Sequence, residues 1–146
     1  MKVYLDACCL QRPMDDQTQP RIRVEAEAVL AVLSAVEGGG IQLIRSDALE
    51  FELARIPNQE RREQAMEILN QAKMRTFCSD QVIALAEQLE NTGVQAMDAL
   101  HLALASLANA DFFATCDDNL LRKGKQFPDL SCNVVSIYEL VQELKQ

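Results

Sequence analysis

The chain has 146 residues, of which 49% are hydrophobic, and this is the size and apolar content of one ordinary domain. Its 22 acidic residues outnumber 14 basic ones, and the net charge of -8 argues against broad electrostatic attraction to nucleic acid. No uncharged apolar run in the sequence is long enough to cross a membrane, and we expect no leader because Met1 and Lys2 continue directly into a strand-like segment. We therefore expect one soluble, cytoplasmic domain over residues 1–146.

Short β-like runs alternate with longer helical patterns along the chain. A strand over residues 2–5 precedes a helix over 21–36, a strand over 41–44, a helix that begins after Ser46 and a helix from Pro57 to residue 73. A strand over 75–78, helices over 80–91 and 97–109, strands over 112–116 and 133–135, and a final helix after Ser136 follow. This order predicts an α/β fold with three layers, in which helices cover both faces of a mainly parallel sheet of about five strands.

Local signals support several of these boundaries. The glycines at 38–40 end the first long helix, and Ser46 is a suitable N-cap for the helix that follows it. Ser136 and Glu139 have the spacing of a capping box. The helix over 97–109 is apolar nearly all round, which predicts that it is buried in the centre of the domain with Asp98 in its first turn.

Four acidic residues, far apart in the sequence, fall where such a fold would gather them. Asp6 and Asp117 follow predicted strands, Asp98 opens the buried helix, and Glu52 lies on the helix after Ser46. The carboxyl ends of the strands in an open parallel sheet are the usual place for ligands. Carboxylates gathered there repel one another unless divalent cations neutralise them, so the pattern predicts a site for Mg²⁺ or Mn²⁺.

Each acid also has a purely structural interpretation. Asp98 could be only a favourable helix N-terminal residue, and Asp6 and Asp117 could only cap loops. Glu50 and Glu52 cannot both face the site, because two positions on a helix are about 200° apart. We favour Glu52 as the residue that faces the site.

Other candidate motifs do not support a histidine or cysteine metal site, redox chemistry or a nucleotide cofactor. His101, the only histidine, lacks a partner at metal-binding spacing, which favours a hydrogen-bonded helix residue over a ligand. Cys8 and Cys9 are better explained by burial near the sheet edge than as a redox pair. The cysteines as a set fit neither a disulfide framework nor a zinc site, and we expect them to be reduced and mostly buried: Cys8, Cys9, Cys78, Cys116 and Cys132. No phosphate-binding or dinucleotide loop occurs.

The acids and their neighbours together resemble a known family, the PIN-domain ribonucleases, which includes the VapC-like toxins of toxin–antitoxin pairs. The resemblance covers essentially the whole chain. It rests on Val3-Tyr4-Leu5-Asp6, on the run from Ser46 to Leu53, on Asp98-Ala99-Leu100-His101 and on Thr115-Cys116-Asp117, in that order. The family often has a further acid two positions beyond the Thr-x-Asp, where this chain has Asn119, with Asp118 between.

This resemblance implies metal-dependent hydrolysis of single-stranded RNA, with Mg²⁺ or Mn²⁺ held mainly by Asp6 and Asp98. Asp117 is then a ligand or a supporting acid, Glu52 a ligand or the residue that orients the attacking water, and Thr115 a hydrogen-bonding partner of the cluster. The resemblance also implies a homodimer and an antitoxin protein that covers the acidic cleft. Two alternatives remain open: a Mg²⁺-dependent phosphohydrolase, and a non-catalytic PIN-like module that binds RNA or protein.

Overall fold

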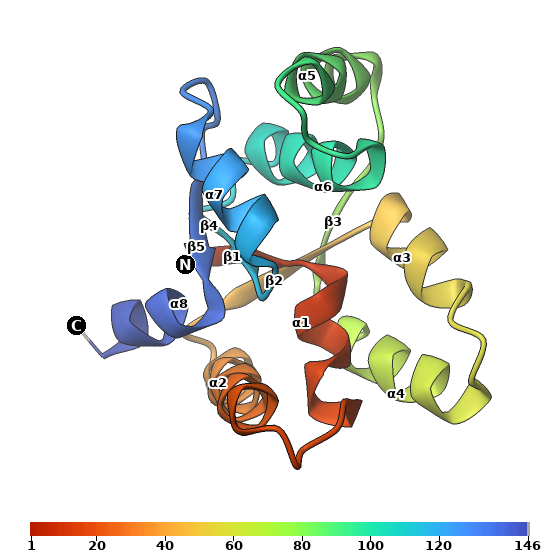
Figure 1. Ribbon diagram of the computed structural model, residues 1–146, viewed down its shortest axis with the longest axis vertical. Coiled ribbons are helices and arrows are strands. Elements are labelled where there is room, and N and C mark those ends of the chain that lie inside the picture. Colours follow the sequence, from red (N-terminus) through yellow and green to blue (C-terminus); the bar gives the residue numbers. More distant parts are fainter. Residues whose placement is uncertain (146) are drawn as a thin grey trace.

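Five parallel strands form the central sheet of the computed structural model, which describes residues 1–145 (Figure 1). The strands are β1 (Lys2–Leu5), β2 (Gln42–Ser46), β3 (Met74–Thr76), β4 (Phe112–Thr115) and β5 (Asn133–Ser136). They lie in the order β3-β2-β1-β4-β5, and each neighbouring pair is parallel. The predicted α/β class with a parallel five-stranded sheet is confirmed.

Helices cover both faces of this sheet and complete the three layers. They are α1 (Ala7–Gln11), the 3₁₀ turn η1 (Arg12–Met14), α2 (Pro20–Glu37), α3 (Asp47–Ala54), α4 (Gln59–Leu69), α5 (Asp80–Asn91), α6 (Ala96–Leu107), α7 (Asp118–Gln126) and α8 (Ile137–Leu144). Helices α1, α2, α4 and α8 lie on one side, and α5, α6 and α7 lie on the other (Figure 1). Within residues 1–145, no helix combines the length and the apolar character that crossing a membrane requires.

Successive strands are added to the sheet first on one side of β1 and then on the other, so the order of strands changes direction between β1 and β4. From β1 it proceeds outward to β2 and β3, and it then returns to the other side of β1 to form β4 and β5. Leu5 pairs with Ala114 in this register, and the backbone N–H of Asp6 donates to the carbonyl of Ala114 at 3.0 Å. The residues that follow β1 and β4 are therefore neighbours at a switch point, the usual position of a ligand site in such sheets.

Helix α6 is buried as its composition predicts. Its residues 101–106 are all buried, and the helix packs against α5 and β4. Beneath it, the Tyr4 ring lies 5.6 Å from that of Phe113 and 5.7 Å from that of His101, between centroids. This packing fixes the first turn of α6, which carries Asp98, relative to β1.

The predicted helix caps are present, whereas some helices differ from the prediction. Ser46 caps α3 through the Leu49 N–H, and the capping box of Ser136 and Glu139 is present. Two helices, α1 and α7, were not predicted, because five residues are too few for a periodic pattern and the sequence of α7 is mostly polar with Gly124 in its interior. Helix α4 ends at Leu69 rather than at residue 73.

Candidate active site

Asp6 stands at the carboxyl end of β1 and begins α1. Its Oδ1 accepts a hydrogen bond from the backbone N–H of Ala7 at 2.8 Å, and its Oδ2 accepts one from Thr115 Oγ1 at 2.9 Å. Only 6% of the residue is exposed. This burial, followed by the neighbouring Cys8, raises the pKa of Asp6 well above its usual range. Asp6 thus caps a helix and also presents a buried carboxylate at the sheet edge.

Asp117 follows β4 and caps α7. Its Oδ1 accepts from the backbone N–H groups of Asn119 and Leu120 at 2.9 and 3.1 Å. Thr115 Oγ1 accepts from the Asp117 N–H at 3.0 Å while it donates to Asp6. The buried hydroxyl of Thr115 therefore links the two strand-end acids directly.

Asp98 lies half-buried in the first turn of α6. The C-terminal end of α6 leads into β4 at the amino edge of the sheet, so its first turn lies at the carboxyl edge. Burial raises the pKa of Asp98, and the negative charges of Asp117 and Glu52 raise it further. Within residues 1–145, no hydrogen bond or ion pair engages the Asp98 carboxylate. The Asp98 carboxylate therefore lies close to other acids without a direct hydrogen-bond or ion-pair partner, although nearby His101 opposes part of the shift.

Glu52 faces α6, whereas Glu50 points to another part of the surface. Glu52 Oε1 lies 3.1 Å from His101 Nε2, and the Glu52 side chain is 33% exposed. Glu50 instead forms ion pairs with Arg75 at 2.6 Å and with Arg45 at 3.5 Å. Of the two glutamates, the structure brings Glu52 next to the helix that carries Asp98.

A buried chain of hydrogen bonds through His101 and Tyr4 orients the Glu52 side chain. Tyr4 Oη lies 2.6 Å from His101 Nδ1 and 2.7 Å from Ser46 Oγ, and this Oγ accepts the Leu49 N–H at 3.0 Å. Because an ionised Glu52 can only accept, His101 Nε2 carries a proton; Nδ1 of a neutral ring then accepts from Tyr4. Burial raises the pKa of Tyr4 well above its usual range, which keeps its hydroxyl protonated. The chain connects β1, α3 and α6 and fixes the direction of the Glu52 carboxylate.

Replacing Tyr4 by phenylalanine should lower the free energy of unfolding by about 1–3 kcal/mol, because it leaves buried groups of Ser46 and His101 without their partner. Urea unfolding curves of the two proteins measure this difference. Tyr138→Phe is the matched control, since its hydroxyl makes only a 3.5 Å contact with the Arg21 carbonyl at the surface. Equal losses in the two variants would remove the case for a structural role of the buried chain.

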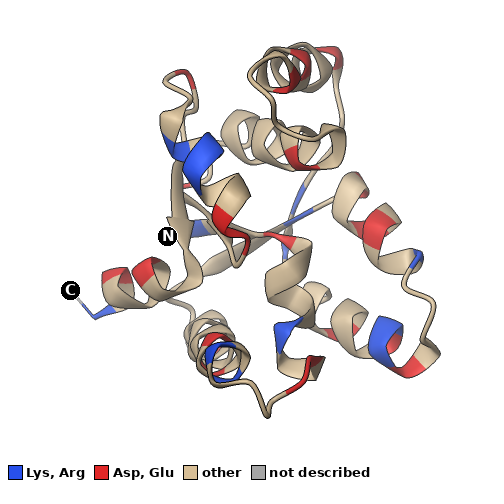
Figure 2. Cartoon of the chain, in the orientation of Figure 1, with Lys and Arg blue, Asp and Glu red and all other residues tan. Residues whose placement is uncertain are grey.

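The four acids surround one side of the sheet edge. Figure 2 shows acidic segments at the junction of β1 with α1, at the starts of α6 and α7, and on α3. In the part of the chain that the structure describes, no three carboxylates bring ligand oxygens within 4.8 Å of one another. Mg²⁺ commonly binds through one or two carboxylates and keeps several water molecules, so it does not require three carboxylates in direct contact. The position of Asp98 beside the negative charges of Asp117 and Glu52 fits a divalent cation.

Arg21, in the first turn of α2, lies at the carboxyl edge of the sheet, next to the end of β4. Its guanidinium binds both oxygens of Asp118 at 2.9 and 2.8 Å and also contacts Glu25 at 3.4 Å. Asn119, where the family often has an acid, accepts from Arg122 at 2.7 Å. Asp118 and Asn119 are thus engaged with basic side chains.

Three cysteine sulfurs meet directly beside Asp6, an arrangement that the sequence did not indicate. The Sγ atoms of Cys8, Cys9 and Cys116 all lie within 4.8 Å of one another. The spacing of the cysteines in the sequence does not indicate a zinc site, and the three meet only because Cys116 reaches Cys8 and Cys9 from the end of β4. Hydrogen bonds from Cys8 and then Cys9 lower the pKa of Cys116 to about 4. The expectation of reduced, mostly buried cysteines agrees with five free thiols, three of them buried.

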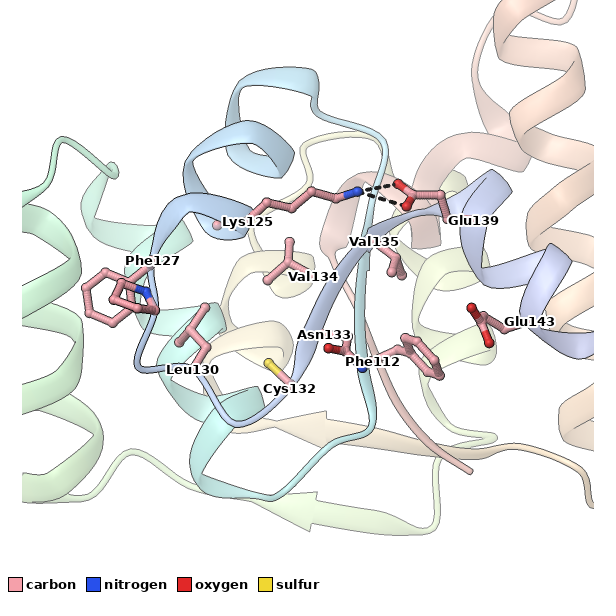
Figure 3. A pocket seen from close by; sticks show the side chains of 12 residues that line it. Phe112, Lys125, Phe127, Leu130, Cys132, Asn133, Val134, Val135, Glu139 and Glu143 are labelled. Carbon is pink, nitrogen blue, oxygen red and sulfur yellow. Dashed lines mark hydrogen bonds and ion pairs between the residues drawn. The ribbon is translucent and has the colours of Figure 1, made fainter.

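A cavity of about 560 Å³ lies elsewhere, between α7, β5 and α8 (Figure 3). The ion pair between Lys125 and Glu139, at 2.8 Å, spans one side of it, and Phe112, Cys132 and Val134 also contribute to its wall. None of the four acids lines this cavity. The carboxylate edge, and not this cavity, is the candidate active site.

His101 is the site residue whose role sequence reasoning missed. The expectation that it is a hydrogen-bonded helix residue is confirmed by its contacts with Tyr4 and Glu52. Its position three residues after Asp98 was the available signal, because side chains three apart share one face of a helix.

Comparison with known proteins identifies the family. The PIN domain family model matches residues 3–126, and no curated protein matches the chain. The structure of FitAcB from Neisseria gonorrhoeae is similar, with a TM-score of 0.55 and 15% identity over 93% of this chain and 98% of that one. VapBC2 from Rickettsia felis, bound to a promoter DNA fragment, gives 0.58 and 14% over 93% and 98%, and PAE2754 from Pyrobaculum aerophilum gives 0.56 and 15% over 99% and 90%. These structures share the fold, and since the family model spans most of the sequence, the chain belongs to the PIN domain family.

Proposed function

We propose that this protein is a metal-dependent endoribonuclease that cleaves single-stranded RNA as the toxin of a toxin–antitoxin pair. PIN domains are generally nucleases. The observation that chiefly supports the proposal is the presence of Asp6, Asp98, Asp117 and Glu52 around the switch point of a PIN domain, with Asp98 close to the charges of Asp117 and Glu52. Hard carboxylate oxygens favour Mg²⁺ or Mn²⁺ over softer ions.

Each acid has a distinct part in the proposed chemistry. A bound Mg²⁺ or Mn²⁺ would polarise the scissile phosphate and lower the pKa of the attacking water. Asp6 and Asp98 are the principal ligands, and Asp117 is a further ligand or a supporting acid. Glu52 either joins the ligands or orients the water, and His101 holds it in place. Thr115 sets the positions of Asp6 and Asp117 through its hydroxyl.

The proposed protein partner is an antitoxin that covers the acidic edge. The resemblance to VapC-like toxins supports this partner, as does the structural similarity to VapBC2 and to FitAB, which was solved with an IR36 DNA fragment. We also propose a homodimer on the basis of this resemblance. The net charge of -8 means that RNA is held by local contacts, since broad attraction would require a basic surface.

Incubation of the purified chain with labelled single-stranded RNA tests the activity. We expect cleavage with Mg²⁺ or Mn²⁺ and none with a chelator. Duplex RNA and p-nitrophenyl phosphate serve as comparison substrates, because hydrolysis of the small ester alone indicates a phosphohydrolase.

A wild type that binds Mn²⁺ in calorimetry but cuts none of a set of mixed-sequence RNAs would contradict the nuclease proposal. That result would favour a non-catalytic binding module. Co-expression with the protein encoded by the adjacent reading frame tests the partner separately, since an antitoxin should copurify with the chain and suppress cleavage.

A further inference from the structure

The cysteine cluster beside Asp6 has a geometry that suits a soft metal ion. Cys8 and Cys9 lie on α1, and Cys116 lies at the junction of β4 with α7. The Sγ atoms of Cys9 and Cys116 are 3.6 Å apart, and the backbone N–H of Cys116 donates to Cys8 Sγ at 3.3 Å. Among residues 1–145, these sulfurs form the one group of three or more possible ligand atoms within 4.8 Å of one another.

The distances agree with what thiolate coordination requires. A tetrahedral Zn²⁺ ion with Zn–S bonds of about 2.3 Å brings its sulfur ligands to about 3.8 Å from one another. The Cys9–Cys116 separation already lies close to this value, and small side-chain rotations would bring Cys8 Sγ into range. The three thiols therefore form most of such a site without rearrangement of the backbone.

A positively charged side chain lies next to the cluster. Arg12 lies beside Cys116, and its Nε is buried without a hydrogen-bond partner in the described part of the chain. A guanidinium at this position would offset part of the negative charge of metal-bound sulfur. Glu25, 3.4 Å from Arg12 Nε, limits the net positive charge that an incoming metal ion would meet.

One member of the cluster is partly exposed and lies next to a carboxylate oxygen. Cys9 and Cys116 are buried, whereas Cys8 is only half-buried, so the cluster opens on the Cys8 side. Cys8 Sγ donates to Asp6 Oδ2 at 3.2 Å, which brings a carboxylate to the rim. Water or this oxygen can complete a tetrahedron. Sulfur selects zinc-like ions while the neighbouring carboxylates select Mg²⁺ or Mn²⁺, so the two kinds of ion are sorted by ligand chemistry.

We propose that Cys8, Cys9 and Cys116 form a binding site for one thiophilic divalent cation of the zinc class, adjacent to the carboxylate edge. Binding exchanges thiol protons, which pass to the solvent, for metal–sulfur bonds. No oxidation state changes, so no oxidant is required. The site does not depend on the proposed nuclease activity.

Titration of the reduced, metal-free chain with Cd²⁺ tests the site directly. We expect one Cd²⁺ per chain, with the ultraviolet sulfur-to-metal absorption band of three thiolates. Cys116→Ser should lose most of this band, and so should Cys9→Ala, each checked for folding by its melting curve. Cys78→Ser is the matched control, because Cys78 is also half-buried but lies outside the cluster, and it should bind as the wild type does.

Two further measurements separate this site from the carboxylate edge. A large excess of Mg²⁺ should leave the cadmium band unchanged, and Asp98→Asn should retain it. Loss of the band in a folded Asp98→Asn protein would show that the ion cannot bind without the acids and would overturn the proposal. A folded Cys116→Ser protein that keeps the wild-type band, or a wild type whose three cysteines alkylate equally fast with and without Cd²⁺, would overturn it as well.

Discussion

Replacing Asp98 by asparagine should lower the rate of RNA cleavage by about 10³-fold or more, which corresponds to a loss of several kcal/mol of transition-state stabilisation. The Asp98 carboxylate is half-buried, unengaged by other groups in residues 1–145, and close to the charges of Asp117 and Glu52. An amide keeps the shape of the side chain but removes the charge that would hold a divalent cation. Asp6→Asn should have an effect of similar size for the same reason.

Single-turnover cleavage of labelled RNA at saturating Mn²⁺ measures this loss. Asp80→Asn is the matched control, because Asp80 is also an acid in the first turn of a helix, α5, but is not among the charges that raise the pKa of Asp98. We expect it to cleave at the wild-type rate. If Asp98→Asn retained wild-type cleavage, Asp98 would be only a favourable helix N-terminal residue.

Metal ions should stabilise the wild type strongly and the Asp98→Asn variant much less. An ion at 100 times its dissociation constant adds about 2.7 kcal/mol to the free energy of unfolding. In the absence of metal, the Asp98→Asn variant should instead be at least as stable as the wild type at neutral pH. The reason is that the charged form of Asp98 is disfavoured in the fold by burial and by neighbouring acids.

The pH dependence of this difference follows from the direction of the pKa shift. The folded state holds the Asp98 proton more tightly than the unfolded state, whose pKa is about 3.9. The wild type therefore loses stability as the pH rises from the unfolded pKa through the raised folded pKa, and the variant lacks this loss. Melting curves at several pH values in chelator, repeated with Mn²⁺, measure both effects. A variant that is less stable than the wild type in chelator at neutral pH would contradict this account.

The parts of the fold that local patterns determine were predictable from the sequence. Helix α5 has the predicted bounds, Asp80–Asn91, and β1 has the predicted bounds, Lys2–Leu5. The buried character of α6 followed from its uninterrupted apolar composition. Helices α1 and α7 were not predictable in this way, because their packing on β4 and β5 is what makes a short or largely polar segment helical.

The candidate site was also predictable only in part. The positions of Asp6 and Asp117 at the ends of strands, and of Asp98 at a helix start, followed from element order alone. The contacts that organise the site join residues far apart, such as His101 with Glu52 and Cys9 with Cys116. Such contacts depend on how strands are ordered across the sheet, and the order of elements along the chain does not determine that.

The position of β1 in the middle of the sheet has a consequence for synthesis of the protein on the ribosome. The first strand to be translated must wait for β4, which begins at Phe112, before its second neighbour exists. Asp6 likewise gains its Thr115 hydrogen bond only when that late segment has emerged. A growing polypeptide therefore cannot join Asp6 to Thr115 before β4 has emerged, so the acidic edge assembles only after residues more than a hundred positions apart have both been made.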